Sequence, residues 1–449
     1  MRSVSGLRGI VGQELTDDVV RRYAGAFGAF LRSRGGTVVA LGRDSRQSGP
    51  AFAAIAAEAL ALAGVDVVDL GMVPTPTAQM AVETNGLAGG IVVTASHNPV
   101  EWNALKFMGP GGRFLAKDEA NAFYAIVDGG APIPAAAVKG RITGDTDAVD
   151  RHLERLFALP WLDLAKVKAR KFSVALDCVR GAGATIMPRL FDALGCTVHA
   201  INMEPDGQFP REPEPTPEHL EEFGVFVRES KADIGIAVDP DVDRCALVDE
   251  TGRPIGEDYT LAFAARAVLA RKPGAVVTNL STSLVLDDAG RAYGQTVERA
   301  PVGEANVVER MALRGAVIGG EGNGGVILPD VHMGRDAPVA ATLALVLLAD
   351  AGVPVSGIVT SAPRYAIVKA KVARPTGSLE PWYEALGRQL PGAQADRQDG
   401  LRLSLADRWV HVRPSGTEPV VRIIAEAPDA AAAHDLIRRG EAALKEMGH

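Results

Sequence analysis

Short runs of apolar and β-branched residues alternate along the chain with longer stretches whose apolar positions have helical spacing. The first series predicts strands at 37–42, 65–70 and 89–96, with a helix at 51–63 and a further helical stretch before the last strand. Short, almost continuous apolar strands separated by helices are typical of parallel sheets that are covered on both faces. The pattern therefore predicts an α/β unit.

The same series occurs twice more, over residues 171–240 and 275–325, and the last strand of each unit ends in a polar loop. A βαβαβ unit presents its ligand-binding loops at the carboxyl ends of its strands, so we expect the chemistry there. The three loops are Ser96-His97-Asn98-Pro99, Asp239-Pro240-Asp241-Val242-Asp243-Arg244 and Gly320-Glu321-Gly322-Asn323-Gly324-Gly325.

From about residue 361 the pattern changes to alternating strands followed by a helix from Ala431 to Met447, which predicts a smaller α+β domain. A loop from Arg413 to Pro419 separates two of these strands. The expected fold class is therefore three tandem related α/β domains with mixed or parallel sheets and a C-terminal α+β domain. The expected boundaries are 1–148, 149–250, 251–360 and 361–449.

The charge balance excludes one class of function. The 449 residues include 47 Lys and Arg against 55 Asp and Glu, a net charge of −8, and only 5% are aromatic. A nucleic-acid-binding protein built on a basic surface, or on aromatic side chains that stack on bases, is therefore not expected. A local basic pocket remains compatible with this composition.

The apolar runs and the cysteines indicate where in the cell the protein is expected. The longest apolar run, Pro338 to Leu348, is too short to cross a bilayer, and the first residues lack a signal-peptide core, so no membrane association is expected. The cysteines are odd in number and lie in apolar runs, which suits reduced thiols and predicts a cytoplasmic protein. They are Cys178, Cys196 and Cys245.

The acidic loop carries the strongest chemical signal. Asp239, Asp241 and Asp243 lie between two strand-like runs, and crowded carboxylate oxygens favour a hard cation such as Mg²⁺. An EF-hand would have Glu250 as its twelfth residue, but it needs glycine at its sixth position, where Arg244 stands. An acidic turn without a ligand is the remaining alternative.

Ser96 could lie in nothing more than a turn, because Ser-His-Asn-Pro is a common turn composition. A serine hydrolase is disfavoured, since no G-x-S-x-G motif is present and neighbouring residues of a strand point to opposite faces, which would separate His97 from Ser96. A phosphorylated Ser96 beside three aspartates would require a divalent cation. The serine loop and the acidic loop thus explain each other.

Two further loops have binding chemistry. Arg413, Ser415, Gly416 and Thr417 combine a guanidinium, two hydroxyls and a glycine, which suits a phosphate cradle, although a plain hairpin turn has the same composition. In the third loop, a carboxylate and an amide between glycines suit sugar hydroxyls; these residues are Glu321 and Asn323.

A Gly181-Ala182-Gly183 sequence follows a predicted strand, but the third glycine of a dinucleotide fingerprint and a G-K-[ST] motif are both missing. We interpret these glycines as packing residues, and do not expect NAD or a P-loop nucleotide site.

Taken together, these motifs resemble the α-D-phosphohexomutase family, which includes phosphoglucomutases, phosphomannomutases and phosphoglucosamine mutases. The resemblance spans nearly the whole chain. In order, the motifs are Ser5-Gly-Leu-Arg-Gly-Ile, Gly42-Arg-Asp-Ser-Arg, Pro74-Thr-Pro-Thr, Thr94-Ala-Ser-His-Asn-Pro, Asn103-Ala-Leu-Lys, Pro205-Asp-Gly-Gln-Phe-Pro, Asp239 to Arg244, Gly320 to Gly324 and Arg413 to Pro419.

The resemblance implies four domains, the last of which closes a central cleft, and a role for each loop. Ser96 would be the phosphoserine donor and, with Asp239, Asp241 and Asp243, would hold Mg²⁺. Basic or proton-transferring roles near the phosphoryl group would fall to His97, Lys106 and Arg244. The substrate would be bound by Arg8, Glu321, Asn323, Arg413, Ser415, Gly416 and Thr417.

The implied activity is that of an isomerase, an intramolecular phosphotransferase that interconverts 6-phospho and 1-phospho hexoses through a 1,6-bisphosphosugar. A hexose 1,6-bisphosphate would prime the phosphoserine, and the partners would be small hexose phosphates, with a monomer or a homodimer as the assembly. The sugar loop GEGNGG departs from many bacterial relatives, which have serine at position 323 and histidine at position 325. The whole pattern, including GEGNGG and the PDGQFP sequence at 205–210, is nevertheless most similar to the phosphoglucosamine mutase branch. The alternatives are a phosphomannomutase or phosphoglucomutase, a sugar-phosphate-binding relative without turnover, and a phosphohydrolase.

Overall fold

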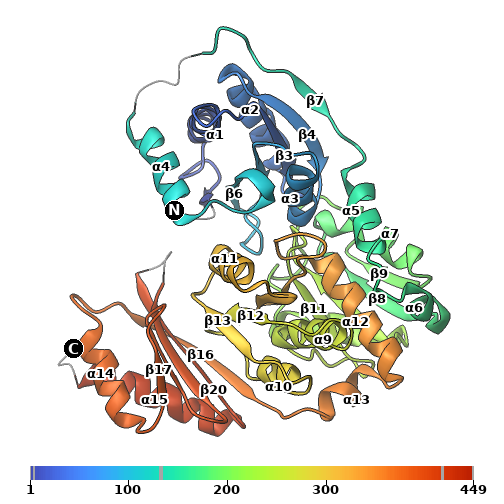
Figure 1. The fold of residues 1–449 in the computed structure, drawn as a ribbon, viewed down its shortest axis with the longest axis vertical. Helices are drawn as coiled ribbons and strands as arrows, with labels where there is room; N and C mark the ends of the chain where they lie inside the picture. The colour runs from blue at the N-terminus through green and yellow to red at the C-terminus, as the bar shows by residue number, and fades with distance from the viewer. Residues whose placement is uncertain (1, 4–5, 131–134, 416–418, 447–449) are drawn as a thin grey trace.

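The computed structural model describes residues 2–3, 6–130, 135–415 and 419–446. Four sheets follow one another along the chain, and Figure 1 shows the N-terminal sheet at the top and the C-terminal sheet at the lower left. Three sheets are mixed and carry helices, whereas the fourth is antiparallel. The expected fold class is confirmed.

The first sheet has the strand order β1-β2-β6-β5-β3-β4-β7. Strand β3 is parallel to β4 and β5, and β6 is antiparallel to both β5 and β2. The strands are β1 Arg2–Ser3, β2 Gly6–Ile10, β3 Val38–Arg43, β4 Asp66–Met72, β5 Gly89–Val93, β6 Trp102–Met108 and β7 Ile142–Gly144. The helices are α1 Asp17–Arg32, α2 Gly49–Leu62, α3 Thr75–Thr84, the 3-10 turn η1 Pro110–Gly112 and α4 Lys117–Asp128.

The second sheet has the order β11-β10-β8-β9 and the third the order β13-β12-β14-β15. The second unit contains α5 Ala148–Phe157, α6 Leu164–Arg170, β8 Ser173–Asp177, η2 Ala182–Thr185, α7 Met187–Ala193, β9 Thr197–Ile201, η3 Pro217–His219, α8 Glu221–Glu229, β10 Ile234–Val238 and β11 Cys245–Val248. The third contains α9 Glu257–Leu269, β12 Val276–Asn279, α10 Val285–Arg291, β13 Val297–Ala300, α11 Glu304–Arg314, β14 Ile318–Glu321, β15 Gly325–Ile327, α12 Ala337–Ala351 and α13 Val355–Thr360.

The fourth sheet has the order β16-β20-β19-β18-β17, with every neighbouring pair antiparallel. Its elements are β16 Ala366–Ala373, α14 Glu380–Gln389, β17 Gln394–Asp396, β18 Leu401–Ser404, β19 Trp409–Pro414, β20 Val420–Ala427 and α15 Ala430–Lys445. The indole of Trp382 is fully buried, and its N–H donates to the carbonyl of Gly440 at 2.8 Å, which fixes α14 against α15.

One feature is common to the first three sheets. A parallel strand, β5, β10 or β14, is followed by a loop and then by an antiparallel strand, β6, β11 or β15. The polar loops identified in the sequence therefore all lie at the carboxyl ends of these strands, as expected for α/β units.

Helix α12 explains the longest apolar run of the sequence. Thirteen of its 15 residues are buried, and it packs between α9 and α6. A helix that is apolar on every side belongs in a protein core or in a membrane. Among the described residues, no helix has both the length and the apolar character needed to cross a membrane.

Two elements differ from their expected bounds. Strand β5 ends at Val93, three residues before Ser96, and Ser96 has the left-handed φ of +51°. In the second series, 171–240, the pattern predicts a helical stretch at 183–195. The structure divides this region into η2 and α7, because Pro188 lies in the first turn of α7 and cannot donate a backbone hydrogen bond.

The core of the first unit contains a cluster of phenylalanine rings. Phe123 of α4 lies 4.7 Å from Phe107 of β6 and 5.5 Å from Phe27 of α1, measured between ring centroids. All three side chains are at most 1% exposed. Helices α1 and α4 are thus joined to the sheet through one buried ring.

We expect Phe123→Ala to lower the free energy of unfolding by about 3–5 kcal/mol, because the cavity cannot be refilled by the surrounding rings. Urea denaturation followed by circular dichroism measures this loss. Leu313→Ala serves as the control, because its side chain is 77% exposed and the change should stay within about 0.5 kcal/mol. Equal losses in the two variants would contradict the role assigned to the cluster.

Candidate active site

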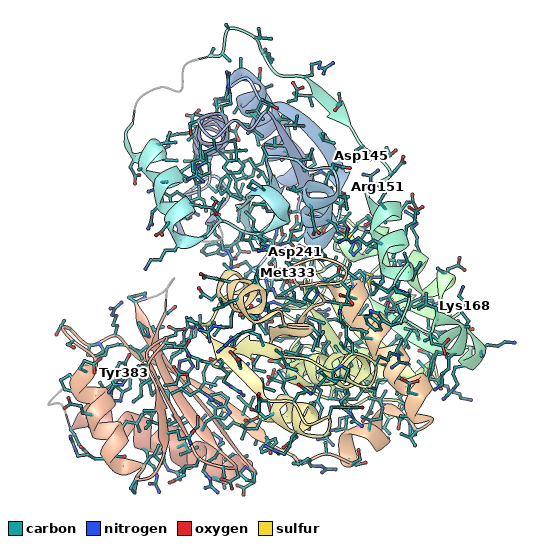
Figure 2. The ribbon with its side chains drawn as sticks, in the orientation of Figure 1. Asp145, Arg151, Lys168, Asp241, Met333 and Tyr383 are labelled. Atoms are coloured by element: carbon teal, nitrogen blue, oxygen red, sulfur yellow. The ribbon has the colours of Figure 1, made fainter. Side chains whose placement is uncertain are left out.

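The loops after β5, β10 and β14 meet at one place in the molecule. The hydroxyl of Ser96 donates to Asp239 Oδ2 at 2.9 Å, which joins the first loop to the second. The backbone N–H of Cys245 donates to the carbonyl of Gly324 at 3.0 Å, which joins the second loop to the third. Figure 2 labels Asp241 near the centre of the molecule, where the three units meet.

The acidic loop turns its three carboxylates toward one another. Each of Asp239, Asp241 and Asp243 offers a carboxylate oxygen within 4.8 Å of the others, and each residue is at most 1% exposed. The turn is closed by Asp239 Oδ1, which accepts the backbone N–H groups of Asp243 and Arg244 at 3.1 Å.

Two oxygens in this group are suited to a metal ion. Asp241 Oδ1 and Asp243 Oδ1 are buried and accept no hydrogen bond from any residue that the structure describes. Because buried polar atoms are nearly always paired, such oxygens indicate a missing partner, and hard cations prefer carboxylate oxygens. The residues therefore fit a divalent cation. Glu250 lies elsewhere and accepts from Ser356, which agrees with the rejection of an EF-hand.

The pKa values of Asp239 and Asp241 depend on burial and on the charges and hydrogen-bond donors around them. Burial, with the charges of Asp243 and Asp241, raises the pKa of Asp239 well above its usual range. Burial by itself would raise the pKa of Asp241 too, but the ammonium of Lys106 and the hydroxyl of Thr75 lower it. Three adjacent buried carboxylates do not all stay ionised without additional positive charge.

Lys106, on β6 of the first sheet, supplies part of this positive charge. Its ammonium lies 2.6 Å from Asp241 Oδ2 and 3.4 Å from Asp243 Oδ2. Burial would lower the pKa of Lys106, but the two aspartates more than offset this effect and raise it. The hydroxyl of Thr75 donates to the same Asp241 oxygen at 2.6 Å.

His97 is close to Ser96, and the expectation that they face apart is wrong. Ser96 Oγ lies 3.3 Å from His97 Nδ1. The alternation of a strand does not extend to these residues, because β5 ends at Val93 and Ser96 adopts a left-handed conformation. Burial, followed by the charges of Arg244 and Arg8, lowers the pKa of His97 well below its usual value.

The other two expected basic residues surround this serine loop. The guanidinium of Arg8 donates to the side-chain oxygen of Asn98 at 2.5 Å. Arg244 pairs with Glu214 at 2.6 Å and extends its Nε to within 3.8 Å of Asp243. Burial would lower the pKa of Arg244, but the charges of Glu214, Asp243 and Asp239 together offset this effect and raise it.

Glu321, in the loop of the third unit, is held by several donors. Its Oε1 accepts the amide of Asn279 and the backbone N–H of Gly303, both at 2.9 Å, and its Oε2 accepts Arg335 at 3.1 Å. Asn323 Oδ1 accepts the backbone N–H of Gly325 at 3.2 Å, within its own loop.

The fourth loop lies on the C-terminal sheet. Arg413, on β19, donates from Nε to Asp399 Oδ2 at 2.8 Å, and Ser415 is buried. Gly416 and Thr417 lie outside the described residues. The contacts described for Arg413 thus join it to its own domain, and those of the other three loops join them to one another.

The glycines after β8 act in packing, as expected. A Cβ on Gly181 would lie 2.6 Å from the backbone of Pro240, and one on Gly183 would lie 2.8 Å from the side chain of Val238. These glycines therefore allow the helix after β8 to approach the acidic loop and β10.

The domain composition is the observation that assigns the family. Models of the phosphoglucomutase/phosphomannomutase family match residues 2–132, 150–252 and 256–365 as α/β/α domains I, II and III, and residues 368–440 as the C-terminal domain. The chain belongs to this family.

Individual relatives match over nearly their whole length. A Methanopyrus kandleri protein named "Probable phosphoglucosamine mutase" is 39% identical over 436 residues, 96% of this chain and 95% of that protein. A Thermococcus kodakarensis protein named "Phosphoglucomutase/phosphomannomutase" is 35% identical, covering 98% of this chain and 97% of that protein. The crystal structure of a phosphoglucomutase/phosphomannomutase family protein from Burkholderia thailandensis has a TM-score of 0.86 at 30% identity, covering 99% of this chain and 98% of that one.

Sequence reasoning missed Arg46, which holds the serine loop of this family member. Arg46 is 1% exposed, and its Nε donates to Asp44 at 3.2 Å. Its other four N–H groups donate to backbone carbonyls at 2.6–2.8 Å, so that all five donors of the guanidinium are used. The accepting carbonyls are those of Ser96, Asn98, Pro99 and Trp102. The Gly42-Arg-Asp-Ser-Arg motif contains Arg46, but only the tertiary structure shows its partners.

We expect Arg46→Lys to loosen the serine loop, because an ammonium has three donors and cannot span four carbonyls. Amide hydrogen exchange of residues 95–102 should become roughly tenfold faster. Arg21→Lys, on an exposed arginine of α1, should leave exchange of this segment unchanged. Unaltered exchange in Arg46→Lys would show that other contacts suffice to hold the loop.

Proposed function

We propose that this member of the family is a phosphohexose mutase that interconverts 6-phospho and 1-phospho sugars, with glucosamine phosphate as its preferred substrate. The observation that carries this proposal is the 2.9 Å contact between the Ser96 hydroxyl and Asp239, in a buried carboxylate cluster with two oxygens that accept no hydrogen bond from the described residues. A serine in such surroundings is suited to carry a phosphoryl group when a cation is bound beside it.

The three aspartates, together with the phosphorylated Ser96, are proposed to hold Mg²⁺. When bound, the ion supplies positive charge that stabilises the phosphoryl oxygens during transfer. This assignment is supported by the buried Oδ1 atoms of Asp241 and Asp243, which accept no hydrogen bond from the described residues, and by the preference of Mg²⁺ for carboxylate ligands.

In the first half of the proposed reaction, a sugar hydroxyl oxygen forms a bond to phosphorus while the bond from phosphorus to Ser96 Oγ breaks. The hydroxyl proton passes to a base, either His97 or Lys106, and the departing Ser96 oxygen takes up a proton. His97 Nδ1 lies 3.3 Å from this departing oxygen. Lys106, Arg244 and Arg8 contribute positive charge around the transferred group.

In the second half, the 1,6-bisphosphosugar has turned over and returns its other phosphoryl group to Ser96 Oγ, while the released sugar oxygen regains a proton. Glu321 and Asn323 are proposed to bind the ring hydroxyls. The phosphate that is not transferred is assigned to the fourth loop, Arg413, Ser415, Gly416 and Thr417. A hexose 1,6-bisphosphate would replace any phosphoryl group that Ser96 loses to water.

The remaining expectations are carried forward as proposals. We place the domain boundaries after residues 148, 250 and 360. The free thiols of Cys178, Cys196 and Cys245 support a cytoplasmic location. The proposed partners are small hexose phosphates, and the assembly is a monomer or a homodimer.

We expect Ser96→Ala to abolish mutase turnover, because the variant lacks the hydroxyl that is proposed to carry the phosphoryl group. Intact-mass analysis should find one phosphate on the purified wild-type protein, mapped to Ser96, and none on the variant. Ser378→Ala, on an exposed serine of the C-terminal domain, should retain full activity. Undiminished turnover by a folded Ser96→Ala protein would refute the mechanism.

The preferred sugar can be tested with glucosamine 6-phosphate, mannose 1-phosphate and glucose 1-phosphate in coupled assays primed by the matching 1,6-bisphosphate. The highest kcat/KM is expected for glucosamine 6-phosphate. A preference for mannose or glucose phosphate would reassign the substrate within the same reaction class. Net release of inorganic phosphate without isomerisation would instead identify a phosphohydrolase, and binding without either reaction would identify a sugar-phosphate-binding relative.

A further inference from the structure

Arg335, in the loop between β15 and α12, lies at the junction of three acidic residues. Its NH2 group donates to Asp243 at 2.7 Å, its Nε to Glu304 at 2.9 Å and its NH1 to Glu321 at 3.1 Å. The side chain is 10% exposed, and its three partners are buried. One rigid guanidinium thus contacts the acidic loop, the start of α11 and the sugar loop.

The planar guanidinium fixes distances that a flexible ammonium would not. Its nitrogens form a rigid fork, so three simultaneous contacts determine where the partner carboxylates stand relative to one another. The contact with Glu304 extends the connection to the first unit, because the amide of Gln79 on α3 donates to the other oxygen of Glu304 at 3.1 Å.

Arg335 contacts one particular oxygen of Glu321. Its Oε1 already accepts two N–H groups, from Asn279 and Gly303, whereas Arg335 is the one donor to Oε2 among the residues that the structure describes. A carboxylate oxygen has two lone pairs, so Oε2 has one free position for a sugar hydroxyl or an amino group. The orientation of that position depends on Arg335.

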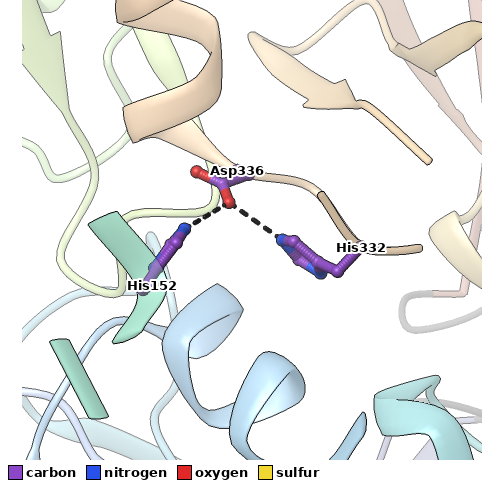
Figure 3. A group of neighbouring side chains, drawn as sticks. All are labelled: His152, His332 and Asp336. Atoms are coloured by element: carbon purple, nitrogen blue, oxygen red, sulfur yellow. Dashed lines mark hydrogen bonds and ion pairs between the residues drawn. The ribbon is translucent and has the colours of Figure 1, made fainter. Parts of the chain in front are cut away.

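The residue after Arg335 is anchored by a second buried cluster. Asp336 Oδ2 accepts His152 Nε2 at 2.8 Å and His332 Nε2 at 2.9 Å, and Figure 3 shows the two rings on either side of the carboxylate. Asp336 Oδ1 accepts the backbone N–H of Val339 at 3.0 Å and so caps α12. All three residues of the cluster are at most 2% exposed.

Backbone contacts complete this anchor. The N–H of Asp336 donates to the carbonyl of Val326 at 2.8 Å, and the N–H of Ala337 donates to the carbonyl of Val242 in the acidic loop at 3.1 Å. His152, from α5, is oriented by the hydroxyl of Thr77 on α3, 2.9 Å from its Nδ1. The segment between β15 and α12, which contains Arg335, is therefore connected to all three units.

The distances in this cluster suit hydrogen bonds better than metal ligation. Each Nε2 lies at hydrogen-bonding distance from the same oxygen, whereas ligands at about 2.0–2.1 Å from a tetrahedral zinc are further apart, at about 3.3 Å. Two N–H donors around one carboxylate form an anchor without an ion.

We propose that Arg335 is a positioning residue that sets the distance between the acidic loop and Glu321, and that the His152–Asp336–His332 cluster positions Arg335. This inference rests on the proposed function for its consequence in catalysis. It assigns a purpose to buried histidines that the phosphoryl-transfer mechanism does not use, and it makes the sugar site dependent on a residue outside the sugar loop.

The first test is structural and does not depend on activity. In Arg335→Lys, amide hydrogen exchange of residues 319–326 and 239–244 should become about tenfold faster or more. Arg438→Lys, on an exposed helix face of the C-terminal domain, should change neither segment. Asp336→Asn should accelerate exchange in the same two segments, and it carries the same test if Arg335→Lys does not fold.

The second test is kinetic. In Arg335→Lys, KM for the hexose phosphate should rise about 10- to 100-fold, while phosphorylation of Ser96 by the 1,6-bisphosphate is retained, as measured by intact mass. Guanidinium ion added to Arg335→Ala should partly restore KM. The free ion can occupy the vacated position and pair with the same carboxylates, although it is not linked to the loop.

Three results would overturn the proposal: unchanged exchange in both folded variants, a fall in kcat with KM unchanged, or stoichiometric zinc in the purified wild-type protein that is lost in His152→Gln. The last result would make the cluster a metal site. If the wild-type protein shows no mutase turnover, the proposed function fails, but faster exchange in Arg335→Lys would still establish the positioning role.

Discussion

Three carboxylates buried in a single turn are the constraint on which the arrangement of the first three units depends. Removing ionised groups from water is costly unless opposite charge and hydrogen bonds surround them. The acidic loop of the second unit cannot supply these partners alone. Lys106 and Thr75 come from the first unit and Arg335 from the third. Compensating the charge of this loop therefore requires all three units to be packed together.

The serine loop illustrates how a scaffold maintains an unfavourable local conformation. A left-handed φ is uncommon for serine, and residues in such regions persist where surrounding contacts hold them. Arg46 provides these contacts by donating to three carbonyls of the loop and to that of Trp102 at the start of β6. The Ser96 hydroxyl consequently has a defined position against Asp239 and His97, which is what a phosphoryl donor at a fixed site would require.

The fourth domain has a different relation to the rest. It is joined to the third unit by polar contacts such as the backbone N–H of Leu284 with Glu426, at 2.9 Å, and Ser281 with His411, also at 2.9 Å. Interfaces of this polar kind are typical of domains that can move relative to one another.

The sequence alone determined the elements, the repeated order and the chemistry of the loops, because apolar periodicity and loop composition are local properties. It therefore predicted four domains of two kinds, and it identified Ser96, the three aspartates and Glu321 as candidates. Only the tertiary structure showed the roles of Arg46 and Arg335 and the pairing of His152 with Asp336, 184 residues away. The sequence also predicted wrongly that Ser96 and His97 face apart, because strand alternation applies only where the strand continues. These features depend on distances between remote segments, which are decided by packing and by the compensation of buried charge.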